Sequence, residues 1–517
     1  MVSKQEARIA NPQPPVRLVR SRSPSRAILI RISIWFMITS RALEYAQSHR
    51  PSFLAQLKDL VRFPSVSSQP KHAQDIKRCA AWLANHLRKI GLDSVRIVPT
   101  PRHPVVYGEW KRAPGRPTVL IYGHYDVLPA DPLREWHSPP FEPTVRGEDL
   151  YGRGACDDKG QFFTHVKALE AYLQTERALP VNVKCVFEGE EEIDSPNLVP
   201  FVAGNNRALR ANVAFMSDSQ MLAPDRPAIT HAQRGALRLE VEVRGPKQDL
   251  HSGSFGGAIH NPLQALCEMI ASLHDKVGRV AIPGFYDRVR PWAAAESASM
   301  RRTGPSDAQI LHDARAEKGW GERGYSLYER TTLRPALTVN GILGGYQGLG
   351  VKAVIPARAL AKISFRLAPD QDPTDIDRLF RRHIARIMPG SVQSAVRTLS
   401  SAKPALMNRN HPSMRAAVLA CWKGFDAVPA FLRTGGSIPA VSIFQEYLGI
   451  PTVHIGLALP DDRIHSPNEK FHLPTFYKGI TTSIWFLAAI GALRRLRASP
   501  REEVEAKAAE WSLAYDH

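Results

Sequence analysis

The chain has 517 residues, too many for one ordinary domain, and its 44% hydrophobic and 23% charged residues are typical of a globular protein with a sizeable core. The net charge of +19 could indicate a nucleic-acid partner, but positions 1–41 hold eight basic residues against one acidic residue and so account for seven of these charges. The rest is spread along the chain without a nucleic-acid-binding motif, so we expect no such partner.

The first 40 residues do not have the pattern of a folded domain. They are basic and rich in proline, so we predict that residues 1–40 are disordered or a non-native extension, with Met37 as the true start. The apolar run at 27–38 is too short to cross a bilayer and lacks a small-residue cleavage site after it, so we expect no membrane association. The five cysteines are odd in number and lack CxxC spacing, which predicts a reducing compartment, the cytoplasm, without disulfides.

Residues 41–234 alternate between helix-like and strand-like stretches, which predicts the first part of an α/β catalytic domain around a mostly parallel sheet. One of the expected helices ends at Gly91, a residue type typical of helix C-termini. The expected helices cover residues 53–63, 75–91 and 160–174, and the expected strands cover residues 117–127, 181–189 and 211–219.

The pattern changes after residue 234. Residues 235–245 and 358–369 alternate between apolar and polar side chains, as half-exposed strands do, and residues 261–277 and 372–387 have the pattern of amphipathic helices. These stretches predict a smaller α+β domain over residues 235–400, inserted into the first domain.

The α/β pattern then resumes over residues 401–498, which we expect to complete the catalytic domain. This part has a strand-like stretch at 451–459 and helix-like stretches at 412–425 and 477–496. The last segment, residues 499–517, is expected to be a charged helical tail.

Imidazole and carboxylate side chains recur where the expected strands of the catalytic domain end. Open parallel sheets place their active sites at this edge, and these side chains are ligands for zinc, manganese or cobalt. Taken singly, each residue has a structural explanation as a helix cap, a turn residue or part of a solvated loop. Together they predict a metal site, made from His124, Asp126, Asp157, Asp158, Glu188, Glu190, Glu191, Glu192, Asp218 and His465.

Six motifs carry a family resemblance. In chain order they are GHYDVLP, GRGACDDKGQ, FEGEEEIDS, MSDSQM, DLHSGSFGGAIHNP and DDRIHSPNEK. The chain thereby resembles the superfamily of dinuclear zinc metallopeptidases that includes aminoacylase, carnosinase, glutamate carboxypeptidase and succinyl-diaminopimelate desuccinylase. The resemblance covers about residues 45–490 and is closest to the dipeptidase and carnosinase branch. It implies a phosphorylase/hydrolase-like catalytic domain and a ferredoxin-like inserted domain that serves as lid and dimerisation surface.

The resemblance implies two divalent metal ions, with zinc favoured and manganese or cobalt as alternatives. His124, Asp157 and Asp218 would hold one ion. Asp157 would bridge to the second ion, which Glu192 and His465 would also hold. Asp126 would hydrogen-bond His124 and fix its tautomer. In relatives the peptide bond after the bridging aspartate is cis, which is here the bond between Asp157 and Asp158.

The same resemblance assigns Glu191 as the general base and His251, contributed by the partner subunit of a homodimer, as the donor to the oxyanion. The implied substrate-binding residues are Arg366, Gly436, Ser437 and Asn340. Within FEGEEEIDS, we expect Glu190 to be solvated, Glu188 to be structural and Ser195 to cap a helix. Cys156, directly before the bridging aspartate, has no assigned role.

We therefore predict a metal-dependent hydrolase that cleaves the amide bond of dipeptides or short peptides next to a free carboxylate. The alternative on the same scaffold is an N-acyl amino acid deacylase of the acetylornithine deacetylase or succinyl-diaminopimelate desuccinylase type. A non-catalytic binding protein would have lost the base or the bridging ligand, and both Glu191 and Asp157 are present.

Overall fold

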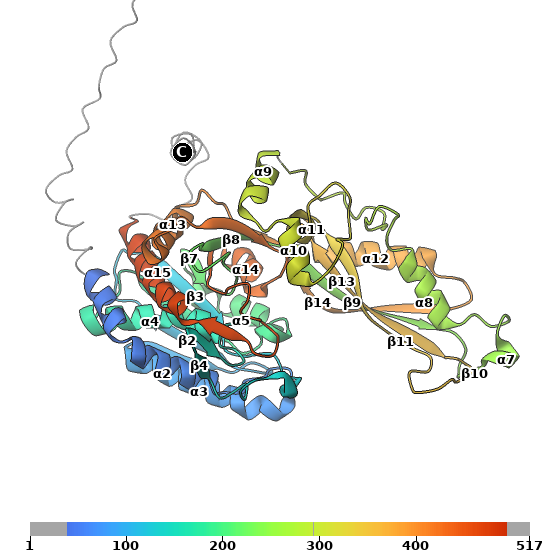
Figure 1. The fold of residues 1–517 in the computed structure, drawn as a ribbon, viewed down its shortest axis with the longest axis horizontal. Helices are drawn as coiled ribbons and strands as arrows, with labels where there is room; N and C mark the ends of the chain where they lie inside the picture. The colour runs from blue at the N-terminus through green and yellow to red at the C-terminus, as the bar shows by residue number, and fades with distance from the viewer. Residues whose placement is uncertain (1–38, 293, 494–517) are drawn as a thin grey trace, which may run out of the picture.

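The computed structural model describes residues 39–292 and 294–493. The expectations for residues 1–38 and for the C-terminal tail lie outside the described residues. The chain forms two large sheets, each with its own hydrophobic core (Figure 1). The predicted α/β architecture with an additional α+β part is confirmed.

The larger sheet has nine strands among the described residues. In sheet order they are β1 (Ser94–Val98), β2 (Val105–Trp110), β6 (Asn182–Glu188), β3 (Thr118–His124), β7 (Val213–Met216), β17 (Thr452–Gly456), β8 (Ala228–Gln233) and β15 (Ala405–Leu406), with β16 (Ala430–Thr434) paired to β8. The central strands β6, β3, β7 and β17 run parallel. Antiparallel pairs flank them, apart from β16, which pairs parallel with β8, so the sheet is mixed. The central parallel strands are buried on both faces.

Helices cover both faces of this sheet. Phe162 packs against Phe187, whereas Tyr122 packs against Phe444 on the opposite face, because successive side chains of a strand alternate. The face of Phe162 carries α2 (Arg50–Val61), α3 (Ala73–Ile90), α4 (Lys159–Glu176), α13 (Pro412–Phe425) and α15 (Leu473–Ala492). The face of Phe444 carries α5 (Leu198–Gly204), α6 (Asn206–Leu209), α14 (Pro439–Ile443) and the π-helical turn η4 (Phe444–Leu448). As predicted, α3 ends on Gly91 in the left-handed conformation, with φ of 107°.

Short elements complete this part of the chain. A small three-stranded sheet joins the segment before α4 to the segment before α15, so that the loops on either side are held together. Its strands are β4 (Thr144–Arg146), β5 (Asp149–Tyr151) and β18 (Lys470–His472). The short 3-10 helices are η1 (Pro70–His72), η2 (Leu133–Glu135) and η3 (Glu191–Ile193).

The second large sheet is antiparallel and has its helices on one face (Figure 1). In sheet order its strands are β11 (Ala336–Gly344), β13 (Arg358–Leu367), β9 (Gly235–Arg244) and β14 (Gln393–Ala402). The helices α8 (Pro262–Ala271) and α12 (Pro373–Ile387) bury Leu266 and Phe380 against it. At the end of this sheet lie α7 (Ser252–Phe255) and the short pair β10 (Leu250–His251) and β12 (Val354–Ile355).

Three further helices lie between the two sheets and were not predicted. They are α9 (Ala294–Thr303), α10 (Asp307–Ala314) and α11 (Leu327–Thr332). The hydroxyl of Tyr328 donates to the carbonyl oxygen of Arg433 at 3.0 Å, and the Arg433 guanidinium forms an ion pair with Glu296. These contacts fasten the helices to β16 at the edge of the larger sheet. Within the described ranges, no helix has the length and apolarity needed to cross a bilayer.

Candidate metal centre and catalytic site

His124 is the last residue of β3 and is completely buried. Its Nε2 atom lies 3.2 Å from Oδ1 of Asp157 and 3.9 Å from Oδ2 of Asp218. Its Nδ1 atom lies 3.2 Å from the carbonyl oxygen of Asp126 and 3.4 Å from the carboxylate of the same residue. The ring is therefore fixed on its Nδ1 side and presents Nε2 to two carboxylates.

Asp157 lies in the loop that leads into α4, and the peptide bond that joins it to Asp158 is cis, as predicted. The carboxylate of Asp158 does not cap the helix. It accepts a hydrogen bond from the backbone N–H of His124 at 3.1 Å instead. A helix cap, one of the structural explanations considered for these residues, therefore does not account for Asp158, and the carboxylates of Asp157 and Asp158 both contact His124 at the end of β3.

Two groups of possible ligands share Asp157. His124, Asp157 and Asp218 form one group, and Asp157, Glu192 and His465 form the other, with the ligand atoms of each group within 4.8 Å of one another. The Nε2 atom of His465 is 2.8 Å from Asp157 and 3.5 Å from Glu192. The five residues predicted as metal ligands thus come together from five separate strand ends and loops.

The donor set fits two divalent ions. The Nε2 atom of His124 is buried and has no hydrogen-bond partner in the described structure, which is costly for a polar atom unless it binds a ligand. Imidazole nitrogens with carboxylates, one of them shared, are the set that zinc, manganese or cobalt pairs take in hydrolases. The site residues therefore fit the metal pair that the resemblance implies.

The electrostatics of the site support the same conclusion. Burial and neighbouring carboxylates raise the pKa of Asp218 well above its ordinary value, and burial with the charge of Asp157 raises the pKa of Glu192 to about 7. Burial alone would lower the pKa of His465, but its contacts with Asp157 and Glu192 raise it to about 10. Clustered carboxylates repel one another, and bound cations would offset this repulsion.

The loop after β6 carries Glu191 and Glu192, and Asp126 holds it in place. The two carboxylate oxygens of Asp126 accept the backbone N–H groups of Glu191 and Glu192, at 3.2 and 3.1 Å. Asp126 therefore contacts both the His124 ring and the backbone of the expected base and ligand. Burial, together with the charge of Glu192, raises the pKa of Glu191 well above its ordinary value, although His124 opposes this effect.

The other two glutamates of the run are both buried. Glu188 accepts hydrogen bonds from Tyr122 at 2.6 Å and from Ser195 at 3.0 Å, so it is structural as predicted. Our prediction that Glu190 is solvated is wrong. It is 2% exposed and accepts the backbone N–H groups of His103 at 2.7 Å and Asn197 at 3.2 Å, because these donors need a buried acceptor.

The predicted helix cap at Ser195 is also wrong. The next helix, α5, begins only at Leu198, with Asn197 as its N-cap residue. The hydroxyl of Ser195 donates a hydrogen bond to Glu188 instead. Ser195 also has a positive φ of 48°, whereas an N-cap residue has an extended conformation.

Two of the residues expected to bind substrate contact each other across the two sheets. Nη1 of Arg366 on β13 donates to the hydroxyl of Ser437 at 3.1 Å, and that hydroxyl donates to the carbonyl oxygen of Arg234 at 2.6 Å. Gly436, the neighbouring residue, has its N–H bonded to Thr434 at 3.2 Å. Asn340 lies apart from this group, exposed at a bulge of β11 and four residues along that strand from the position opposite Arg366.

His251 is exposed and lies on β10, at the end of the second sheet away from the larger sheet (Figure 1). Its Nδ1 atom accepts the backbone N–H of Gly253 at 3.1 Å. The structure of the single chain therefore does not bring His251 to the metal ligands.

Cys156 is buried directly before Asp157. Burial, together with the charge of Asp462, raises the pKa of its thiol well above the ordinary value, and its Sγ atom donates to Asp462 at 3.4 Å. The side chain is a packed, protonated thiol, which matches a structural role.

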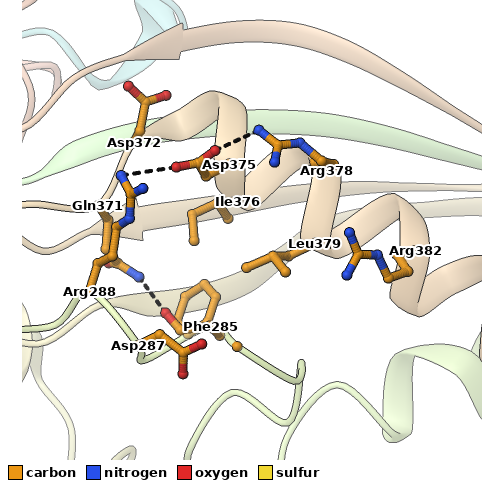
Figure 2. Close-up of a pocket in the computed structure, with 11 residues that line it drawn as sticks. Phe285, Asp287, Arg288, Gln371, Asp372, Asp375, Ile376, Arg378, Leu379 and Arg382 are labelled. Atoms are coloured by element: carbon orange, nitrogen blue, oxygen red, sulfur yellow. Dashed lines mark hydrogen bonds and ion pairs between the residues drawn. The ribbon is translucent and has the colours of Figure 1, made fainter.

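Two hollows lie outside the ligand cluster. A cleft of about 550 Å³ is lined by Glu135, His137, Asp313, Arg315 and, on either side of His465 in the sequence, Arg463, Ser466, Pro467 and Asn468. A smaller hollow of about 200 Å³ lies on α12 (Figure 2). At its centre Asp375 already contacts Arg288 at 3.1 Å and Arg378 at 2.6 Å, so we assign the hollow no ligand.

Comparison with known proteins identifies the family. The family model for peptidase family M20/M25/M40 matches residues 120–488, most of the chain and all five predicted metal ligands. The chain belongs to this peptidase family. Membership confirms the predicted resemblance and makes the chain a metal-dependent hydrolase of peptide bonds.

Dipeptidases are among the relatives of this M20 peptidase. Human Beta-Ala-His dipeptidase is 31% identical over 459 residues, which is 86% of this chain and 90% of the relative. The Cys-Gly metallodipeptidase of Candida albicans is 30% identical over 452 residues, 84% of this chain and 93% of the relative. The solved structure of the di-peptidase Dug1p from Saccharomyces cerevisiae has a TM-score of 0.79 at 26% identity and covers 88% of this chain and 99% of that chain.

Two residues that shape the site of this peptidase were not predicted. Glu469 is fully buried and accepts the backbone N–H groups of Gly154, Cys156 and Asp157, at 3.2, 3.0 and 3.1 Å. His454 accepts the backbone N–H of Asp218 at 3.1 Å. Glu469 lies four residues after His465 within a quoted motif, and that proximity was the available signal.

Proposed function

We propose that this M20 peptidase hydrolyses dipeptides, cleaving the amide bond next to a free carboxylate. The observation that carries the proposal is the pair of ligand groups that share Asp157, with Glu191 directly beside the ligand Glu192. The relatives named as dipeptidases support a small peptide substrate over a long one.

The metal-binding side chains would be His124, Asp157 and Asp218 for one ion and Asp157, Glu192 and His465 for the other. Two bound divalent ions supply Lewis acidity, which acidifies a water molecule and polarises the scissile carbonyl. We favour zinc, with manganese or cobalt as alternatives.

Glu191 would take the proton from the attacking water and deliver it to the nitrogen of the scissile bond. The leaving group is then a neutral amine and not an amine anion. Asp126 would keep the Glu191 carboxylate aimed at the reacting water by holding its backbone N–H.

The free carboxylate of the substrate would bind to Arg366 and Ser437, with the backbone of Gly436 beside them. A guanidinium offers a forked set of donors that matches a carboxylate, and the hydroxyl of Ser437 is already at hydrogen-bond distance from it. The cleft lined by Arg463 and Ser466, which flank His465 in the sequence, would receive the amine-side residue, and we propose that Asn340 lines the site only when a second chain is present.

His251 would act from the partner subunit of a homodimer, as a donor to the oxyanion of the tetrahedral intermediate. The support is the position of β10 at the end of the second sheet, away from the larger sheet (Figure 1), and the exposed apolar side chains of residues 255–259 and 342–351. The latter include Phe255, Ile259, Ile342, Leu343, Tyr346, Leu349 and Val351. Such a patch at the tip of the second sheet would be buried by a second copy, and residues 235–400 would then serve as lid and dimerisation domain.

We further propose that the protein works in the cytoplasm. All five of its cysteines are unpaired in the structure, as a reducing compartment requires.

A hydrolysis screen with metal-loaded protein tests the proposed substrate class. Dipeptides, N-acetyl amino acids and N-succinyl amino acids share the same scissile amide and free carboxylate and differ on the amine side. We expect turnover of dipeptides that contain a free amine and little turnover of the acyl compounds. Preferred cleavage of N-acyl amino acids would instead support the deacylase alternative.

A further inference from the structure

The mechanism above leaves one arginine near the substrate-binding group unused. Arg238 lies on β9, where it alternates with the core residues Leu237 and Leu239, so its side chain points to the face of the second sheet without helices. The register of β9 and β13 pairs Arg238 with Ser364 and Ala236 with Arg366. Arg238 and Arg366 are therefore diagonal neighbours on one face, with Cα atoms about 7–8 Å apart, within reach of two long side chains.

A carboxylate of the catalytic loop already binds Arg238. The Nη1 atom of Arg238 forms an ion pair with Asp194, which lies two residues after the ligand Glu192. The same atom donates a hydrogen bond to the hydroxyl of Ser400 at 3.1 Å. The side chains of Arg238 and Asp194 are 37% and 41% exposed, so another anion can reach the guanidinium. The structure thus shows that a carboxylate fits at Arg238.

The surroundings hold more positive than negative charge. Arg234 is buried nearby and donates to the carbonyl oxygens of Arg330 and Arg334, both at 3.2 Å, rather than to a carboxylate. Burial, together with the charge of Arg366, lowers the pKa of Arg234 to about 9. Burial and the charge of Arg238 likewise lower the pKa of Arg366, against the opposing effect of Asp194. Three arginines with one carboxylate among them favour a ligand that brings more than one negative charge.

We propose that Arg238 is a specificity-determining residue that binds the side-chain carboxylate of the substrate's C-terminal residue. Arg366 and Ser437 bind the α-carboxylate, as in the proposed function on which this inference rests. The enzyme then prefers dipeptides that end in glutamate or aspartate. Asp194 occupies Arg238 until such a substrate replaces it, and it acts as an internal competitor.

The test compares two dipeptides that differ in charge and hardly in shape, Ala-Glu and Ala-Gln. The ratio of their kcat/KM values is measured for metal-loaded, full-length wild type and for Arg238→Gln and Asp194→Asn. We expect Arg238→Gln to lower the Glu/Gln ratio about tenfold, as the loss of one hydrogen bond to a charged group at a partly exposed site implies. Asp194→Asn should raise the ratio, because it removes the competing carboxylate.

Two further variants complete the design. Arg238→Lys keeps the positive charge and should recover part of the ratio. Arg397→Gln is the matched control, because Arg397 lies on the same face of the neighbouring strand and pairs with Glu240 at 2.7 Å, farther from the site. It should leave the ratio unchanged.

The inference would be overturned if Arg238→Gln and Asp194→Asn changed kcat/KM by the same factor for both dipeptides. An ion pair of Asp194 and Arg238 that only fastens the loop to the second sheet would affect both substrates alike. An unchanged ratio in Arg238→Gln would overturn it as well, while continued cleavage of Ala-Gln would leave the proposed function standing. If metal-loaded wild type cleaved neither dipeptide, the proposed function would fail first and the inference with it.

Discussion

The buried pair of Glu469 and Arg153 gives a quantitative prediction about how the bridging aspartate is held. Nη1 of Arg153 donates to Glu469 at 2.6 Å, and the two side chains are 1% and 0% exposed. The same carboxylate accepts the backbone N–H groups of Cys156 and Asp157. Burial raises the pKa of Glu469, whereas Arg153 and these N–H donors all favour its charged form.

Glu469→Gln keeps the shape of the side chain and removes its charge. Arg153 is then a buried cation without a counter-charge, and breaking a buried pair in this way costs about 3–5 kcal/mol of unfolding free energy. The amide also turns an NH₂ group toward backbone donors, so the Asp157 peptide loses an acceptor. We therefore expect lower metal affinity in addition to lower stability.

Denaturant unfolding and metal analysis of the purified variant measure the two effects. Lys403→Gln is the control, because Lys403 and Glu446 form a half-exposed pair at 2.8 Å, worth about 0–1 kcal/mol. The double variant Arg153→Gln, Glu469→Gln should lose less stability than the two single losses added together, since it leaves no lone buried charge. A loss below about 1 kcal/mol for Glu469→Gln, with normal metal content, would refute the reasoning.

Three other predictions concern single glutamates. Glu192→Ala should lower the metal content by one ion per chain, and an unchanged content by metal analysis would contradict its role as ligand. Glu190→Gln should cost about 1–3 kcal/mol, because an amide hydrogen would face buried donors, and an unchanged melting temperature would count against this. Burial raises the pKa of Glu170, but His86 and Lys167 lower it to about 2, from 4.5 unfolded. Its stabilisation of about 3 kcal/mol is therefore complete above pH 4.5 and lost as the pH falls toward 2. The difference in unfolding free energy between wild type and Glu170→Gln should shrink over that range, and a constant difference would contradict it.

The order of the strands predicted where the metal site lies, and the family resemblance selected the five ligands among the residues at that edge. His124, Asp218 and His465 follow parallel strands, and parallel strands end at one edge of a sheet. The run FEGEEEIDS was harder, since four identical side chains do not indicate which of them meets buried donors. Glu190 is buried because Asn197 and His103 lie beside it, and these contacts depend on how the loops pack.

Other features depended on long-range packing as well. Glu469 binds backbone groups more than 300 positions earlier in the chain, so its place in the DDRIHSPNEK motif points to the site but not to these partners. The helices α9 and α11 are held by particular contacts with β16, such as that between Tyr328 and Arg433, which the local sequence pattern does not show. The ion pair of Asp194 and Arg238 joins residues that the sequence pattern assigns to two different domains, so it could not be predicted from either domain alone.

The central claim is that Glu191 acts as the base beside a pair of metal ions, and one comparison tests it most directly. Metal content and dipeptide turnover are measured side by side for wild type and Glu191→Gln, both loaded with the same metal. The account predicts two ions per chain in both proteins and a loss of turnover of about 10²–10⁴-fold in the variant, as expected when general base catalysis is removed. A variant that binds two ions and retains full turnover would contradict the account.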